Sequence, residues 1–336
     1  MARIWMSGLE AGHIEIFDAA AWTAISAAQA RTGSYSVNLS NDSFSYVRSA
    51  LPAAIAEVYF RFGFHTDFDT GTRLLCLYDS GGTTQFTLTV QKEIHMFEAR
   101  RGLFNGTILG RGGEIHQNRW HCVEVRLKVD NAAGVVQVKV DGTLVIDFAG
   151  DTQETANADI LSFQFGIPGD TLINTYIDDI AFNDISGGAN FDWIGRGGIP
   201  AIFPIGAGAS TDLDLFPNTG EANWEDVDEV PPDDDTSYVF DDLIDDHDSY
   251  ETDDLPTTGT ISAVQWVARA KSDLVGNPEI MRVLRIGGVD YDGAVDIAID
   301  ADYDYYPEIL DEDPDAGPGA WTVAAVNGME VGVKVR

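Results

Sequence analysis

Paired carboxylates would be the chemical centre of a glycosidase, because one must donate a proton while the other attacks the sugar or activates water. Two such groups reach one cleft when they stand at alternate positions of a strand. The sequence contains no Glu-x-Asp-x-Glu run, and Asp178-Asp179 should place its carboxylates on opposite faces of a strand. It also lacks a Gly-x-Ser-x-Gly elbow. These absences predict that the chain is not an enzyme.

Closely spaced aspartates are the sequence's candidates for holding a cation. Asp300, Asp302 and Asp304 stand two residues apart, so a strand would present all three on one face. They do not form an EF-hand, because Tyr305 occupies the sixth position, where such a loop needs glycine. Asp178 and Asp179 are a second candidate pair. We therefore expect either no cofactor or Ca²⁺ at these aspartates, with solvated faces and turn caps as the alternative.

Exposed aromatic side chains would be needed for a third kind of chemistry, the binding of sugars. Such a site combines a flat apolar surface with nearby amide or carboxylate groups at a loop rim. The sequence offers four candidates, Tyr78, Phe104, Trp5 and Trp22. Most aromatic residues of a globular protein belong to its core, so the sequence does not show which of the four are exposed.

Strands must position these residues, because the first 185 residues alternate with period two. Residues 57–65 place Val58, Phe60, Phe62 and Phe64 on one side, and residues 122–129 repeat the pattern. Asp141-Gly142 joins two further strands as a tight hairpin. Roughly a dozen short strands separated by turn residues are typical of a sandwich or jelly roll. The fold class is therefore all-β, with a jelly roll over residues 1–185.

The remainder of the chain changes in character twice. Residues 186–212 form a glycine-rich connector whose large apolar residues should pack on another surface. Residues 213–336 alternate again and predict a second, smaller β-sandwich domain. Its acidity is pronounced, because residues 225–254 hold 15 acidic residues and neither Lys nor Arg.

Charge excludes several classes of partner. Residues 1–200 carry 14 Lys+Arg and 23 Asp+Glu, a net charge of −9, and residues 201–336 carry 6 and 32, a net charge of −26. Binding nucleic acid or an anionic membrane needs cationic contacts, so neither is expected. No apolar run is long enough to span a bilayer, and the N-terminal residues lack the apolar stretch of a signal peptide.

Two resemblances sharpen this interpretation. Arg119-Trp120-His121-Cys122, the turn at Asp141-Gly142 and the run 176–182 are similar to concanavalin A-like and laminin-G-like jelly rolls. Phe216-Pro217-Asn218, Asn223-Trp224 and the closing residues 330–334 resemble a module of virion structural proteins from long-tailed phages. The first resemblance implies a lectin-like sandwich over residues 1–185, and the second implies a virion component.

The leading hypothesis is therefore a bacteriophage virion structural protein of the capsid or tail, which acts by non-covalent assembly. It implies synthesis in a host cytoplasm, location in the virion, other virion proteins as partners and a homo-oligomeric state. One alternative is a carbohydrate-binding receptor module that recognises a host-surface glycan. Another is a polysaccharide glycosidase or depolymerase. The jelly-roll fold alone does not choose among them.

Overall fold

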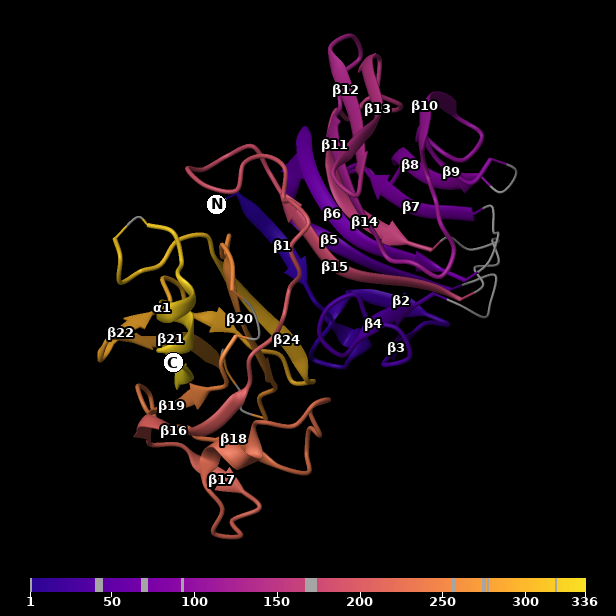
Figure 1. Ribbon diagram of the computed structural model, residues 1–336. Coiled ribbons are helices and arrows are strands. Elements are labelled where there is room, and N and C mark those ends of the chain that lie inside the picture. The colour runs from indigo at the N-terminus through magenta and orange to yellow at the C-terminus, as the bar shows by residue number, and fades with distance from the viewer. Residues whose placement is uncertain are drawn as a thin grey trace. The chain divides into compact units, whose positions relative to one another are not determined.

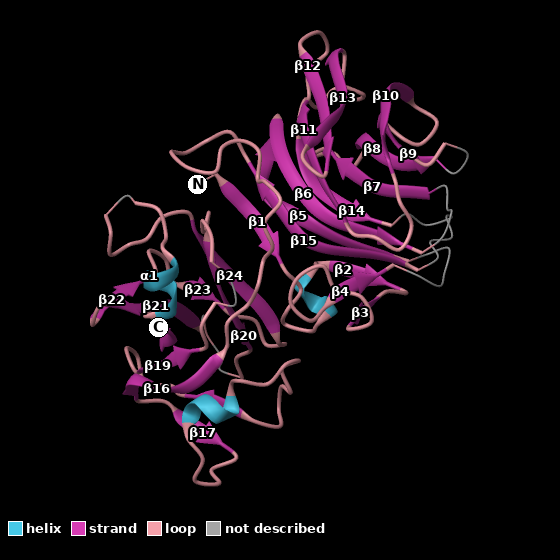
Figure 2. Ribbon diagram, viewed as in Figure 1, coloured by secondary structure: helices cyan, strands magenta, loops and turns pink. Residues whose placement is uncertain are grey.

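The computed structural model describes residues 2–39, 45–67, 72–91, 94–166, 174–255, 258–273, 276, 278–317 and 319–336. The chain divides into two compact units. The first unit comprises Met1–Glu10 and Ile14–Ile199, and the second comprises Ala11–His13 and Pro200–Arg336. Strands dominate both units (Figure 2). Within the described residues, no helix is long and apolar enough to cross a membrane.

The first unit contains an eight-stranded antiparallel sheet (Figure 1). Its order is β13 (Thr143–Gly150), β12 (Gly134–Val140), β11 (His121–Lys128), β6 (Glu57–Thr66), β15 (Thr175–Asn183), β4 (Ser36–Asn38) and β3 (Ala24–Ser26). A further strand, β1 (Arg3–Ser7), pairs with β15. The predicted hairpin joins β12 to β13, and both Asp141 and Gly142 have the positive φ angles that such a turn requires.

A seven-stranded antiparallel sheet is the other layer of this sandwich. Its order is β10 (Thr107–Glu114), β9 (Met96–Arg101), β8 (Thr84–Gln91), β7 (Thr72–Tyr78), β14 (Ile160–Phe165), β5 (Tyr46–Ile55) and β2 (Ala19–Ala21). The single turn η1 (Ile14–Ile16) precedes β2. Alternating residues of both sheets meet in one core, where the rings of Phe163 and Phe182 stack with centroids 4.4 Å apart.

Strand β6 is more deeply buried than its alternation predicts. Its inward residues Phe60, Phe62 and Phe64 are fully buried, but Tyr59 and Arg61 on the opposite face are also buried. Residues 193–199 cover that face: the ring of Trp193 lies edge-on to Tyr59 at 5.4 Å, and the Arg61 guanidinium donates to the Gly197 carbonyl at 2.6 Å. This part of the glycine-rich segment therefore packs on the first unit.

The second unit is built around a six-stranded sheet. Its order is β16 (Pro204–Thr211), β19 (His247–Thr252), β25 (Glu330–Val335), β21 (Glu279–Ile286) and β22 (Val289–Asp292), with β23 (Ile297–Ala298) also paired to β21. Two-stranded sheets join β17 (Asp214–Phe216) to β18 (Tyr238–Phe240) and β20 (Val264–Ala270) to β24 (Asp304–Leu310). The turn η2 (Asn223–Asp226) and the short helix α1 (Val323–Asn327) complete the unit.

A separate, smaller core holds the second unit together. Trp266, Tyr306 and Trp321 are its largest members, and the Trp266 indole donates to the Gly332 carbonyl at 3.0 Å. Both units are thus antiparallel β-structures with apolar interiors, and the predicted all-β sandwich class is confirmed.

Candidate functional site

The outer face of the seven-stranded sheet carries polar side chains in rows that cross the strands. The register of five adjacent strands places one residue from each strand next to its neighbour in a single row, which consists of Arg48, Gln164, Cys76, Thr87 and Arg100. Neighbouring strands lie about 4.8 Å apart, so this row is about 19 Å long. Most of the residues that alternate with these along each strand point the other way, into the core.

Parallel rows extend this surface on both sides. One contains Arg73, Thr89, Glu98 and Arg111, and the next contains Gln91, Met96 and Glu114. On the opposite side lie Ala50, Ser162, Tyr78 and Thr84. We call these four rows the arginine face. Its residues stand on strands rather than loops, so their relative positions are fixed by backbone pairing.

Glu98 anchors one half of the arginine face. Its side chain is fully buried, and one oxygen accepts from Arg100 Nε at 2.5 Å and from Gln91 Nε2 at 3.0 Å. The other oxygen pairs with the guanidinium of Arg111, whose side chain is half exposed. One carboxylate is therefore shared by two arginines, which leaves this cluster with a net positive charge.

Tyr78 and Arg48 occupy the other half. The guanidinium carbon of Arg48 lies 4.6 Å above the Tyr78 ring, and its Nη2 donates to Ser162 Oγ at 3.1 Å. Burial is the main cause that raises the pKa of Tyr78 well above its usual value, and the neighbouring Cys76 adds to the shift. The phenol therefore keeps its proton at neutral pH. Cys76 in turn lies 3.4 Å from Thr87 Oγ1.

The four aromatic candidates for sugar binding have different surroundings. Tyr78 lies on the arginine face, and Phe104 lies at its edge, where the guanidinium carbon of Arg73 is 4.5 Å from the ring centroid. Trp22 is 70% exposed, and its carbonyl accepts from Ser45. Trp5 packs against the core rings of Phe17, Phe163 and Phe182. The structure therefore associates two of the four with the polar surface.

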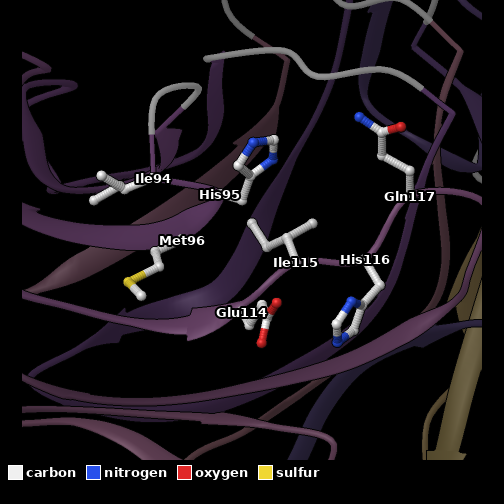
Figure 3. A pocket seen from close by; sticks show the side chains of 7 residues that line it. All are labelled: Ile94, His95, Met96, Glu114, Ile115, His116 and Gln117. Atoms are coloured by element: carbon white, nitrogen blue, oxygen red, sulfur yellow. The ribbon is translucent and has the colours of Figure 1, made fainter.

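A cavity of about 460 Å³ lies beside the arginine face. Figure 3 shows the side chains of His95 and His116 on either side of Ile115. Met96 and Glu114 line this cavity and also form a row of the face, so the two surfaces are continuous. The neighbouring His121 is structural: its Nε2 accepts from the His116 backbone at 3.0 Å, and its Nδ1 lies 3.0 Å from Asp141 Oδ2.

Asp178 and Asp179 lie at a β-bulge, and the predicted opposite placement of their carboxylates is wrong. The register of β15 against β6 shifts after Asp178, and Asp179 has φ of +50°. The bulge turns both side chains towards the segment at Arg31 and Thr32. The Asp178 carboxylate accepts a hydrogen bond from the Arg31 backbone N–H at 2.7 Å. The Asp179 carboxylate pairs with the Arg31 guanidinium. It also accepts hydrogen bonds from the Thr32 hydroxyl at 2.7 Å and from the Ile199 backbone N–H at 2.6 Å.

This arrangement uses the aspartates for internal contacts. Burial, reinforced by the charge of Asp179, raises the pKa of Asp178 above its usual range and so disfavours its charged form. Calcium prefers ionised oxygen ligands. A cation here would compete with the guanidinium of Arg31 for Asp179. Calcium binding at this pair stays a prediction. The hydrogen bonds and the ion pair with Arg31 account for the positions of both aspartates without a cation.

The aspartates of the second unit are dispersed along its surface. Asp300, Asp302 and Asp304 are all exposed, and β24 begins only at Asp304, so the three do not share one strand face. The Asp300 backbone donates to the Tyr306 hydroxyl at 2.8 Å. Over the part of the chain that the structure describes, no three His, Cys, Asp or Glu side chains are grouped to hold a metal ion. Calcium at these residues also stays a prediction.

The arginines are the functional candidates that sequence reasoning missed. Arg48, Arg73 and Arg100 each stand next to a core residue on their own strands, which is the ordinary signature of a solvated strand face, and Arg111 stands between two glycines. Their convergence depends on the pairing order β5-β14-β7-β8-β9-β10, which joins strands far apart in the sequence. The available signal was the recurrence of arginine on four of the paired strands, β5, β7, β9 and β10.

Comparisons with known proteins give fold likenesses only. No protein-family model matches the chain, and no curated protein sequence matches it. Among solved structures, alginate lyase Aly36B is 17% identical, with a TM-score of 0.37 over 55% of this chain and 93% of that one. Domain 4 of the arabinanase AbnA from Geobacillus stearothermophilus is 17% identical, with a TM-score of 0.34 over 49% and 76%. Carbohydrate-binding module CBM66 from Bacillus subtilis is 9% identical, with a TM-score of 0.31 over 48% and 95%.

These comparisons correct two predictions. The matched proteins are carbohydrate-active enzymes and a carbohydrate-binding module, which contradicts the prediction of a phage virion structural protein. Two of the three are enzymes or parts of enzymes, which contradicts the prediction that the chain has no catalytic function. At these identities and TM-scores, the likenesses name neither a substrate nor a reaction for this chain.

Proposed function

We propose that the first unit binds a polysaccharide on the arginine face. The observation that carries the proposal is the set of aligned rows on six paired strands. In these rows the four arginines, the Gln91 amide and the Tyr78 hydroxyl belong to side chains that reach solvent beside the exposed Phe104, above a floor of buried polar residues. Sugars offer hydroxyls that accept and donate hydrogen bonds, and ring faces that pack on aromatics. The resemblance of this unit to concanavalin A-like jelly rolls agrees with such a role.

The shape of the surface favours a polymer over a small molecule. Small-molecule sites are usually concave and enclose most of the ligand. The arginine face instead extends about 24 Å across six strands, given a spacing of about 4.8 Å between neighbours. It also leads into the cavity beside Met96 and Glu114. An extended chain of sugars could contact several rows at once.

Binding to a panel of immobilised polysaccharides tests this proposal. Phe104→Ala should weaken binding about tenfold, because loss of an aromatic contact to the sugar removes on the order of 1.4 kcal/mol. Phe191→Ala is the matched control, since Phe104 is 50% exposed and Phe191, which lies off the arginine face, is 49% exposed. Equal affinities for the two variants would contradict the proposal, as would the absence of binding to every polysaccharide.

Cleavage of the bound polymer is a second candidate function, favoured by the environment of Tyr78. Its phenol lies beside the Arg48 guanidinium and could pass its proton to the departing glycosidic oxygen while water bonds to the anomeric carbon, and the proton that the water releases would restore the phenol. The rows of the face supply two carboxylates, Glu98 and Glu114, and Glu98 is held by two arginines. Release of new sugar ends from a bound polysaccharide, abolished in Tyr78→Phe, would support this function. Binding without any release of sugar ends would leave only the binding role.

A further inference from the structure

We infer that the arginine face selects a polysaccharide that carries carboxylate or sulfate groups. This inference rests on the proposed binding function and adds the charge of the ligand. The four rows contain the positive side chains Arg48, Arg73, Arg100 and Arg111 and the negative side chains Glu98 and Glu114. Among these six side chains the charges sum to +2, in a chain whose net charge is −35.

Arg48 provides the clearest anion-binding group. Its guanidinium contacts the Ser162 hydroxyl and the Tyr78 ring, and within the described residues no carboxylate pairs with it. The side chain is half-buried, so water screens it less than it would a fully exposed side chain. A planar guanidinium presents paired N–H donors that match the two oxygens of a carboxylate or sulfate.

Arg111 provides a second, more accessible group about five strand spacings from Arg48. Its Nε is engaged by Glu98, and its side chain is 47% exposed. Glu98 also neutralises part of Arg100, whose Nη1 donates to the Gly106 carbonyl at 3.0 Å. The buried carboxylate thus orients two guanidiniums and cancels only one of their charges. A second anionic group on the same polymer could bind there.

The excess of positive charge on the arginine face contrasts with the negative net charge of the whole chain. A surface with a large negative charge repels polyanions at long range, and the repulsion is screened over about 8–10 Å at moderate ionic strength. Neutral sugars would need no arginines and would gain nothing from them beyond hydrogen bonds. A cluster of four arginines on one rigid face of an acidic molecule therefore favours an anionic ligand.

Matched polymers test the inference. Polygalacturonate and its methyl ester share one backbone and differ in carboxylate charge, while dextran sulfate and dextran differ in sulfate. We expect the charged member of at least one pair to bind at least tenfold more tightly to the full chain. The pair that shows the difference identifies carboxylate or sulfate as the group that is recognised.

Variants assign the selectivity to the arginine face. Arg48→Gln and Arg111→Gln should each weaken binding of the charged polymer about tenfold or more, as expected for loss of a charge-assisted hydrogen bond. Binding of the neutral polymer should change much less. Arg126→Gln is the matched control, because Arg126 lies on β11 of the other sheet and is paired with Glu57. Circular dichroism and thermal unfolding of each variant show whether its fold is retained, and Arg111 is exposed enough to be replaced without loss of the fold.

The outcomes separate this inference from the proposed function. If each neutral polymer binds as tightly as its charged partner, charge selection is overturned while polysaccharide binding stands. If no polymer binds, both fail. Equally tight binding of single-stranded DNA would show attraction of any polyanion and would overturn selection of a glycan. An effect of Arg126→Gln equal to that of Arg48→Gln would remove the assignment to this face.

Discussion

Asp179 in the first unit and Asp226 in the second are both buried carboxylates, but their surroundings are opposite in charge. Asp179 is fully buried and pairs with Arg31, with additional donors from Thr32 and Ile199. Asp226 is 3% exposed, and its Oδ2 has no hydrogen-bond partner in the described structure. Its pKa is raised by burial and then by the negative charges of neighbouring acidic residues.

The difference follows from the supply of cations in each part of the chain. Residues 1–200 contain 14 Lys+Arg, and buried carboxylates such as Asp179 and Glu98 each have arginine partners. Residues 201–336 contain only 6 Lys+Arg for 32 acidic residues. In the first unit, arginine partners therefore hold the buried carboxylates in place. In the second unit, the excess of acidic residues makes the surface strongly negative and leaves the buried Asp226 among like charges.

The largest expected effect comes from breaking the Asp179 pair. Asp179→Ala should lower the free energy of unfolding of the first unit by about 3–5 kcal/mol, because it leaves the Arg31 charge without its partner. Urea unfolding followed by fluorescence measures the change. Asp147→Ala, which removes an exposed carboxylate on β13, is the control and should have little effect. Equal losses in the two variants would contradict the structural role of Asp179.

Glu98→Gln should have the next largest effect. Replacing the charged acceptor of two arginines weakens hydrogen bonds inside a buried cluster, so the free energy of unfolding should fall by about 1–3 kcal/mol. The same change raises the net positive charge of the arginine face. Binding of a charged polysaccharide should therefore be retained or strengthened although stability falls. Parallel loss of stability and binding would show that Glu98 positions the arginines in a way that the amide cannot replace.

Asp226→Asn tests the buried carboxyl that lies among like charges, through the pH dependence of stability. Because the folded state raises the pKa of Asp226, its contribution to stability is fully present below the unfolded pKa and is lost as pH rises through the folded value. The variant should therefore raise the thermal midpoint of the second unit by a few degrees at pH 7. The gain should shrink as the pH falls below 3.8, the ordinary pKa of an aspartate, because the Asp226 carboxyl is then protonated in both states. Thermal unfolding at a series of pH values measures this, and a gain independent of pH would argue against the charge explanation.

The smallest effect is expected at the surface pair of Lys271 and Asp235. Both side chains reach solvent, and exposed ion pairs contribute little to stability. Lys271→Ala should leave the thermal midpoint unchanged within error. A clear decrease, particularly one that persists in high salt, would point to the contact between Lys271 and the Tyr303 ring rather than to the ion pair.

Local pattern predicted the strands well but not the features that join distant parts of the chain. Alternation identified β6 and β11, and Asp141-Gly142 identified the hairpin between β12 and β13. The burial of Arg61 depends on residues 193–199, which are more than a hundred positions away. The alternation around β6 carries no information about that covering segment.

The candidate site shows the same limit. Tyr78 and Phe104 could be selected from the sequence as aromatic residues, but the arginine face requires the register of six strands. A shift of one residue in any strand would send its side chains to the core. The bulge at Asp179 was also unpredictable from alternation, because it interrupts the period on which the prediction relied.

The pairing of β1 with β15 has a consequence for how the chain reaches its fold. Arg3 meets Asn183 across 180 positions, and its Nε donates to the Asn183 side chain at 2.5 Å. At a synthesis rate of about 5–20 residues per second, β1 waits on the order of ten to forty seconds for its partner. During that interval Ile4, Trp5 and Met6 have no completed sheet edge to join. The first unit therefore closes late, and agents that protect exposed apolar strands should increase its folding yield.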